Sequence, residues 1–217
     1  MKLRYLGHSC FQWITDNGVT VLTDPYTKVG YEMPQNLCAE LVMCSHEHFD
    51  HYYLPGVDGV ACVNKAAGDA EYKEIRMQGI QTSHDDKNGA LRGQNIVFKF
   101  WIDGICFCHL GDLGEPLTQA LAEKIGAVDV LLIPIGGTYT IDARQAKAYI
   151  ERIAPKLVIP MHFRPKDGGL DIAEPSAFLQ FFDKERIVKA FGEVELTTET
   201  MSALSGKILY MDRVEKL

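Results

Sequence analysis

Long hydrophobic segments are absent from this sequence. No run reaches the roughly 18 apolar residues that a membrane-spanning helix needs. The first residues, from Met1 to His8, also lack the apolar stretch of a secretory leader. We therefore expect a cytoplasmic protein without a membrane partner.

Positive charge is scarce as well. The 217 residues include 22 Lys and Arg against 29 Asp and Glu, and the formal net charge is −7. This balance excludes a broad surface for nucleic acids or anionic membranes. A small-molecule substrate is the expected partner, and it can be anionic because a bound metal ion reverses the charge locally. The oligomeric state is left open.

Closely spaced cysteine pairs are missing too. The six cysteines are scattered, and most lie in apolar runs. Cys106 and Cys108 have one residue between them, whereas zinc knuckles and redox pairs have two residues between their cysteines. Without an export signal we expect reduced, buried thiols.

The segments that are present predict strand hairpins followed by alternating strands and helices. Asp16-Asn17-Gly18 is a hairpin signal between two apolar segments. No repeat, low-complexity run or linker interrupts the chain, which predicts one domain over residues 1–217 with two mixed sheets and helices outside. The predicted strands are 3–6, 11–15, 19–23, 41–44, 60–63, 80–83, 96–102, 105–108, 128–133 and 157–160, and the predicted helices are 66–76, 116–125, 142–153 and 176–183.

One short segment, SHEHFDH from Ser45 to His51, contains three imidazoles and two carboxylates directly after an apolar run. His46 and His48 are two residues apart, so in an extended chain they share a face and can hold one cation. Asp50 and His51 follow a turn and point elsewhere. One metal ion would leave good ligands unused, whereas two ions use them all. A charged surface loop is the alternative interpretation.

Most other histidines also follow a predicted strand. His84 follows 80–83, His109 follows 105–108 and His162 follows 157–160. Ligands bind in the loops beyond strand ends in open α/β sheets, so we expect these side chains to gather at one edge. His84, Asp112 and His162 can supply the further ligands that two ions need.

These motifs resemble those of the metallo-β-lactamase fold superfamily over nearly the whole chain. SHEHFDH is similar to its His-x-His-x-Asp-His signature, HLGDLG (109–114) to its Gly-Asp motif and IPMHF (159–163) to its last histidine motif. YLGHSCF, LTDP, LLIPIGGTYTID and PKLVIPMHF resemble the branch that contains L-ascorbate-6-phosphate lactonase. The resemblance implies an α/β (α+β) fold of four layers, an αββα sandwich of two mixed β-sheets flanked by helices, with a metal site at one edge.

The resemblance also implies a ligand set. The first ion would be bound by His46, His48 and His84, the second by Asp50, His51 and His162, and both by a bridging Asp112. His109 is the alternative to His84 as the third ligand of the first ion. We favour His84 and expect His109 to orient a ligand or the substrate.

Two further residues are candidates for supporting the ligands. His8, in the segment LGHSC, either packs under the site without a chemical role or orients a ligand. Asp24, before Pro25, is either a turn residue or the hydrogen-bond partner of a ligating histidine, which we favour.

Five more residues are candidates for contact with the substrate. Tyr139 and Thr140 follow a Gly-Gly pair at a strand end and either pack within the loop or touch the substrate. Arg92, Arg164 and Lys166 are either ordinary surface charges or receptors for a phosphate group.

The implied function is metal-dependent hydrolysis of a small ester, either a lactone or a phosphodiester. Two divalent ions can share a hydroxide, because metal binding lowers the pKa of water to about 7. Zn²⁺ is the expected metal, with Mn²⁺ and Fe²⁺ as alternatives. Asp50, His109 and Tyr139 are the candidate proton carriers. A single-iron oxygenase and a metal-binding protein without catalysis are the alternative functions.

Overall fold

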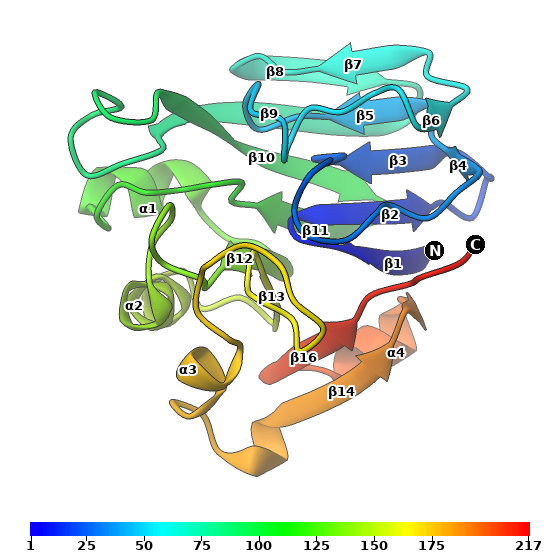
Figure 1. Ribbon diagram of the computed structural model, residues 1–217. Helices are drawn as coiled ribbons and strands as arrows, with labels where there is room; N and C mark the ends of the chain where they lie inside the picture. Colours follow the sequence, from blue (N-terminus) through cyan, green and yellow to red (C-terminus); the bar gives the residue numbers. More distant parts are fainter.

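The computed structural model describes residues 1–217 and contains two large β-sheets that pack against each other (Figure 1). The first sheet, in the order β15-β1-β2-β3-β5-β7, consists of β1 (Lys2–Gly7), β2 (Cys10–Ile14), β3 (Thr20–Thr23), β5 (Leu41–Met43), β7 (Cys62–Asn64) and β15 (Glu193–Glu195). The second, in the order β14-β16-β13-β12-β11-β10-β9-β8, consists of β8 (Gly68–Tyr72), β9 (Ile75–Ser83), β10 (Gln94–Ile102), β11 (Ile105–His109), β12 (Val130–Pro134), β13 (Leu157–Met161), β14 (Ile187–Phe191) and β16 (Lys207–Asp212). Each sheet mixes parallel and antiparallel pairs, as predicted.

The main core lies between the two sheets. Trp13 of the first sheet meets Phe100 and Phe107 of the second, edge to face, with ring centroids 5.1 and 5.6 Å apart. Along β5, Leu41 and Met43 belong to this core, whereas the intervening Val42 points to the other face. This period of two is the geometry of a strand that is buried on both faces, and it explains the continuous apolar sequence there.

The outer face of the first sheet is covered by a loop, not by a helix. Tyr26, Val29 and Leu37 pack there with Leu22 and Val42 in a second, smaller apolar cluster. The covering segment includes β4 (Leu37–Cys38), which pairs with β6 (Val57–Asp58). The layer of helices predicted on both sides is therefore present mainly beside the second sheet.

Helices α1 (Gln119–Ile125), α2 (Ala143–Ile153) and α3 (Ser176–Leu179) lie beside the second sheet (Figure 1). Asp142 caps α2 through a capping box with Gln145, as its sequence predicts. The remaining elements are the 3₁₀ turn Lys184–Arg186 and α4 (Thr198–Ala203). None of these helices is long and apolar enough to cross a membrane.

The helix predicted over residues 66–76 is wrong. The segment forms β8 and the start of β9, joined by a turn in which Lys73 has a φ of +50°. Its alanines, glutamates and lysines favour a helix locally, but β9 offers a long antiparallel edge to which β8 pairs from Gly68 to Tyr72. Tertiary pairing has overridden propensity here.

Candidate metal centre

The candidate ligands lie on loops that follow strands of both sheets. His46 to His51 follow β5, His84 follows β9, and His8 lies between β1 and β2. The loops after β11 and β13 contribute Asp112 and His162 and belong, like His84, to the second sheet. Together these segments bring eight residues to one edge of the sandwich: His8, His46, His48, Asp50, His51, His84, Asp112 and His162.

Three of these residues, His46, His48 and His84, form what we call the open group. Their ligand atoms lie within 4.8 Å of one another. The ring centroid of His46 is 4.5 Å from that of His48 and 4.6 Å from that of His84. His48 is exposed and the other two are buried, so this group reaches the surface on one side.

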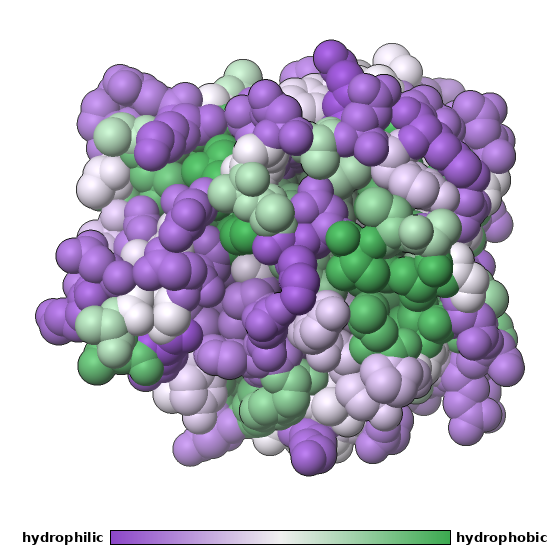
Figure 2. All heavy atoms as spheres, turned by 90° about the horizontal axis from the view of Figure 1, so that it is seen from above, coloured by the Kyte–Doolittle hydropathy of each residue, from purple (hydrophilic) through white to green (hydrophobic).

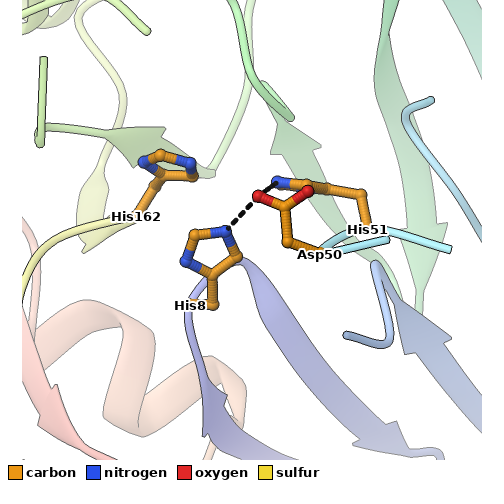
Figure 3. A group of neighbouring side chains, drawn as sticks. All are labelled: His8, Asp50, His51 and His162. Carbon is orange, nitrogen blue, oxygen red and sulfur yellow. Dashed lines mark hydrogen bonds and ion pairs between the residues drawn. The ribbon is translucent and has the colours of Figure 1, made fainter. Parts of the chain in front are cut away.

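Four other residues, His8, Asp50, His51 and His162, form what we call the sealed group (Figure 3). All four are buried, and their ligand atoms also lie within 4.8 Å of one another. Nε2 of His8 is 3.3 Å from Oδ2 of Asp50, and the rings of His8 and His162 are 4.2 Å apart. The sequence placed His8 near the site, and the structure places it inside this group.

Asp112 lies between the two groups, and its side chain is almost fully buried. Its Oδ1 is 3.1 Å from Nε2 of His51. Its Oδ2 is 3.3 Å from Nε2 of His84 and 3.2 Å from Nε2 of His162. Nε2 of His46 is 4.0 Å away. One carboxylate therefore faces imidazoles of both groups.

Several polar atoms of the cluster have no hydrogen-bond partner. These buried atoms are Nε2 of His46, Nε2 of His51, Oδ1 of Asp112 and both ring nitrogens of His162. Leaving a buried polar atom unpaired costs about 1–3 kcal/mol, so such a concentration at one point needs an explanation. Imidazole and carboxylate atoms are ligands of divalent transition metals. The residues present therefore fit metal ions.

Two imidazole rings of the cluster are oriented by hydrogen bonds through the ring nitrogen that faces away from it. Nδ1 of His51 donates to Oδ2 of Asp24 at 2.8 Å, so its Nε2 faces the cluster. Nδ1 of His84 donates to the carbonyl oxygen of Tyr139 at 3.1 Å. Such partners fix ring orientation and make a ligating imidazole more basic. The expected hydrogen bond between Asp24 and a histidine of the motif is thus present.

Three residues in or next to the sealed group have a strained backbone. His8, Asp24 and His162 have φ values of +53°, +41° and +51°, in the left-handed region that non-glycine residues rarely adopt. The backbone N–H of His162 donates to the carbonyl of His8 at 2.9 Å. Asp24 accepts from the backbone N–H of Ser45 at 2.7 Å and from its hydroxyl at 2.8 Å. These bonds hold the strained residues in place.

Burial and neighbouring charges set the protonation of the cluster. Burial, followed by the charge of the neighbouring His51, lowers the pKa of His46 to about 3, so this imidazole is neutral at neutral pH. Burial likewise lowers the pKa of His84. Burial would also lower the pKa of His51, but Asp112 and Asp24 raise it well above its usual value. Burial alone would raise the pKa of Asp112, but His162 and His51 hold this pKa well below its usual range.

His109 is held apart from the cluster. Its Nε2 donates to the carbonyl of Ser9 at 2.8 Å, and its Nδ1 accepts from the N–H of Gly111 at 3.2 Å. The ring is fully buried with both nitrogens engaged. His84 and not His109 joins the open group, and the structure gives no support for His109 as a proton carrier.

The other candidates for substrate contact fall in different places. The guanidinium of Arg92 lies 5.6 Å from the ring centroid of Tyr139, beside the open group. The hydroxyl of Thr140 bonds the carbonyl of Ile141, within its own loop. Arg164 pairs with Asp171 and Glu174, and Lys166 lines a separate cavity; the structure brings neither of them into the eight-residue cluster.

Two supporting residues escaped the sequence analysis. The side chain of Asn95 accepts from the backbone N–H of Asp112 at 2.8 Å and donates to the carbonyl of Leu110 at 3.0 Å, which fixes the bridging loop. Asp85 accepts backbone N–H groups from the loop that follows it. The sequence Asp85 to Gly89 is typical of a turn and could have indicated Asp85. No local pattern indicates Asn95.

Comparison with known proteins places the chain in a family. Residues 2–162 match the family model described as beta-lactamase superfamily domain. The chain is 30% identical over 211 residues to a UPF0173 protein of Pyrococcus furiosus, an alignment that covers 86% of this chain and 93% of that protein. It is 31% identical over 208 residues to a UPF0173 metal-dependent hydrolase of Thermoplasma acidophilum, covering 82% and 89%.

A solved structure is similar over almost the full length. It is that of a Thermotoga maritima protein described as a candidate Zn-dependent hydrolase of the metallo-beta-lactamase superfamily. The TM-score is 0.77 at 32% identity, and the match covers 98% of this chain and 99% of that chain. The predicted fold is confirmed, with fewer helices than expected. The chain therefore belongs to the metallo-β-lactamase superfamily, and within it to the UPF0173 family of metal-dependent hydrolases.

Proposed function

We propose that this protein is a binuclear metal-dependent hydrolase that acts on a small ester, either a lactone or a phosphodiester. The observation that carries the proposal is the position of Asp112. Its buried carboxylate lies within 3.3 Å of an imidazole nitrogen of the open group and of two in the sealed group. A carboxylate in such a position can bind two ions at once.

The residues divide into two ligand sets around Asp112. His46, His48 and His84 would hold the first ion, Asp50, His51 and His162 the second, and Asp112 both. His84 is proposed in place of His109, because its Nε2 faces Asp112 while both nitrogens of His109 are engaged elsewhere. The absence of a thiolate favours Zn²⁺, Mn²⁺ or Fe²⁺. We propose Zn²⁺ first, in keeping with the description of the Thermotoga relative.

When bound, two such ions would supply a water of lowered pKa and a Lewis acid for the attacked oxygen. The residues of the chain itself orient the ligands and keep bulk water away from one side of the centre. Asp24 and the carbonyl of Tyr139 fix two imidazole rings, so the ligands are positioned before substrate arrives. The buried sealed group excludes bulk water from its side, which leaves the exposed His48 side for entry of the substrate.

Proton transfer to the leaving group needs a side chain that reaches the reacting atoms. Asp50 lies inside the cluster and keeps a small exposed fraction, 9%. The ring of Tyr139 lies at the rim and is 40% exposed. We propose Asp50 as the proton carrier, because a carboxylate beside the cluster can pass a proton without a movement of the loop.

The test combines metal analysis with a substrate panel. The protein is purified without added metal, its bound metals are counted, and Zn²⁺-loaded and Mn²⁺-loaded samples are assayed on lactones and phosphodiesters. Two ions per chain and turnover that disappears on chelation are expected. Iron with oxygen consumption would identify an oxygenase instead, and bound metal without turnover would identify a binding protein.

A pair of variants makes the test specific. Asp112→Asn removes the charge that both ions share, so both metal content and turnover should fall. Asp129→Asn is the matched control: Asp129 pairs with Lys156 near the start of β12, away from the cluster. Equal metal content in the two variants would contradict the bridging role of Asp112.

A further inference from the structure

The three basic residues that the sequence offers near the histidine motifs differ in whether their charge is available. Arg164 lies 3.4 Å from a carboxylate oxygen of Asp171 and 3.2 Å from one of Glu174, so it is neutralised. Lys166 lines a cavity of about 550 Å³ that contains none of the ligand residues, and Asp167 lies there too. Only Arg92 remains as a cation beside the ligands.

Arg92 lines a cavity of about 490 Å³ together with His46 and His48 of the open group. The other charged residues of this cavity, Lys65 and Glu47, form an ion pair with each other. No carboxylate contacts the guanidinium of Arg92, whose Cζ lies 5.6 Å from the ring centroid of Tyr139. The cavity therefore has one uncompensated positive charge from the protein, although the chain as a whole carries a net charge of −7.

The loop that carries Arg92 is held in a fixed conformation by Asp85. The buried carboxylate of Asp85 accepts backbone N–H bonds from Lys87 and Gly89 on Oδ1, and from Leu91 and Arg92 on Oδ2, at 2.7–2.9 Å. Asp85 also directly follows His84, a member of the open group. The position of Arg92 is thus tied to the cluster, and less ordering remains to be done when an anion binds.

Apolar side chains are exposed on loops that also carry residues of the site. Of the five large hydrophobic residues that the molecule exposes, Phe49, Leu91 and Tyr139 belong to loops of the site: Phe49 follows His48, Leu91 precedes Arg92, and the carbonyl of Tyr139 binds His84. Their exposed fractions are 51%, 66% and 40%. The face of the molecule in Figure 2 is mostly hydrophilic, with several apolar areas among the polar side chains. The exposed ring of Tyr139 beside the guanidinium of Arg92 suits a ligand with both an apolar and a charged part.

We propose that the site takes an anionic ester whose carboxylate or phosphate is received by Arg92 and whose apolar part lies against Tyr139. This inference rests on the proposed hydrolase function and names its substrate class. A guanidinium matches a carboxylate or phosphate with two parallel hydrogen bonds, which a neutral ester cannot provide. Arg92 would then select the substrate, while the metal cluster would act on its ester bond.

The first experiment measures binding alone. Inorganic phosphate is titrated calorimetrically into Zn²⁺-loaded protein from which free metal has been removed, for the unaltered chain, Arg92→Gln and Arg164→Gln. Loss of one charge-assisted contact should weaken phosphate binding by about tenfold in Arg92→Gln. Arg164→Gln is the matched control, because Asp171 and Glu174 already neutralise Arg164, and its affinity should stay within about twofold of the unaltered chain. Equal affinity in all three proteins, or equal weakening in both variants, would overturn the proposal.

The second experiment measures selectivity. 4-Nitrophenyl acetate and the 4-nitrophenyl monoester of succinate differ by a carboxymethyl group, which carries a terminal carboxylate. Arg92→Gln should lower the ratio of kcat/KM for the succinate over the acetate by about tenfold, and Arg164→Gln should leave this ratio unchanged. An unchanged ratio in Arg92→Gln would count against the anion site. If no protein hydrolyses either ester, the ester hydrolase proposal loses support, and the phosphate titration still decides the role of Arg92.

Discussion

The open and sealed groups have similar ligands but different surroundings. The open group borders a cavity and includes the exposed His48. The sealed group consists of four buried residues, two of them with left-handed backbone, and His51 lies between two buried carboxylates. One half of the centre is therefore part of the protein core, and the other half is part of its surface. This difference separates the contribution of a ligand to folding from its contribution to metal exchange and substrate entry.

The largest expected effect comes from the sealed side. His51→Ala leaves Asp24 and Asp112 buried without the imidazole that lies 2.8 and 3.1 Å from them. Removing one partner of a buried charged network costs about 3–5 kcal/mol. Denaturant unfolding of the chelated protein should show a decrease of this size, and metal analysis should show the loss of one ion.

His48→Ala is the matched change on the open side. The side chain of His48 is exposed, and no hydrogen bond or ion pair joins it to the protein, so the free energy of unfolding of the chelated protein should change by no more than about 0.5 kcal/mol. One ion should still be lost. A similar decrease in stability for His48→Ala and His51→Ala would remove the distinction between the two groups.

The second prediction concerns Asp24, which orients His51. Asp24→Asn keeps a side chain that tolerates the φ of +41°, but it removes the charge that accepts from Nδ1 of His51. Affinity for the sealed ion should fall by about 10- to 100-fold, as with other outer-shell partners. Competition with a chromophoric chelator measures this affinity for each ion. An equal decrease for the two ions would argue against a direct role at His51.

The third prediction concerns the order of metal loss. Because only the open group has an exposed ligand, its ion should leave first when the loaded protein is mixed with a chelator. We expect two phases of about one ion each, with rates that differ by about tenfold or more, since burial slows access to the sealed ion. His48→Ala should abolish the fast phase alone. A single phase that releases both ions would show that the sealed group is no less accessible.

Most residues of the cluster can be identified from the sequence because their positions depend on local rules. A compact motif after a buried strand, and histidines at the ends of later strands, are visible without tertiary information, and His46, His48, Asp50 and His162 all reach the cluster. The sequence favours His84 over His109, and in the structure it is His84 that joins the open group, while its role as a ligand stays a prediction. His109 ends β11, but its ring bonds the carbonyl of Ser9, in the turn between β1 and β2 of the other sheet, a contact that depends on how the two sheets pack.

The dependence on tertiary contacts also explains why the sequence does not show which basic residue has an unpaired charge near the site. The sequence alone does not distinguish the three basic residues Arg92, Arg164 and Lys166. Each follows a candidate ligand histidine within ten residues. What separates them is pairing for Arg164, which has two carboxylate partners, and place for Lys166, which lines a different cavity from Arg92. Arg164 is neutralised by residues seven and ten positions later, whereas Arg92 is left unpaired by a loop that folds around Asp85. Partners of this kind depend on loop conformation, which the residue pattern does not specify.

The smallest expected effect concerns His8, the one residue of the sealed group that is outside the proposed ligand set. Its Nε2 lies 3.3 Å from Oδ2 of Asp50, so a hydrogen bond there would hold this carboxylate toward the second ion. His8→Ala should weaken binding of the sealed ion by about two- to tenfold, the value of one hydrogen bond, and His8→Gln should restore part of it through its side-chain amide. Metal titration of both variants measures the difference. Complete loss of one ion in both would mean that His8 is itself a ligand, and that the sealed side has a fuller coordination shell than the open side.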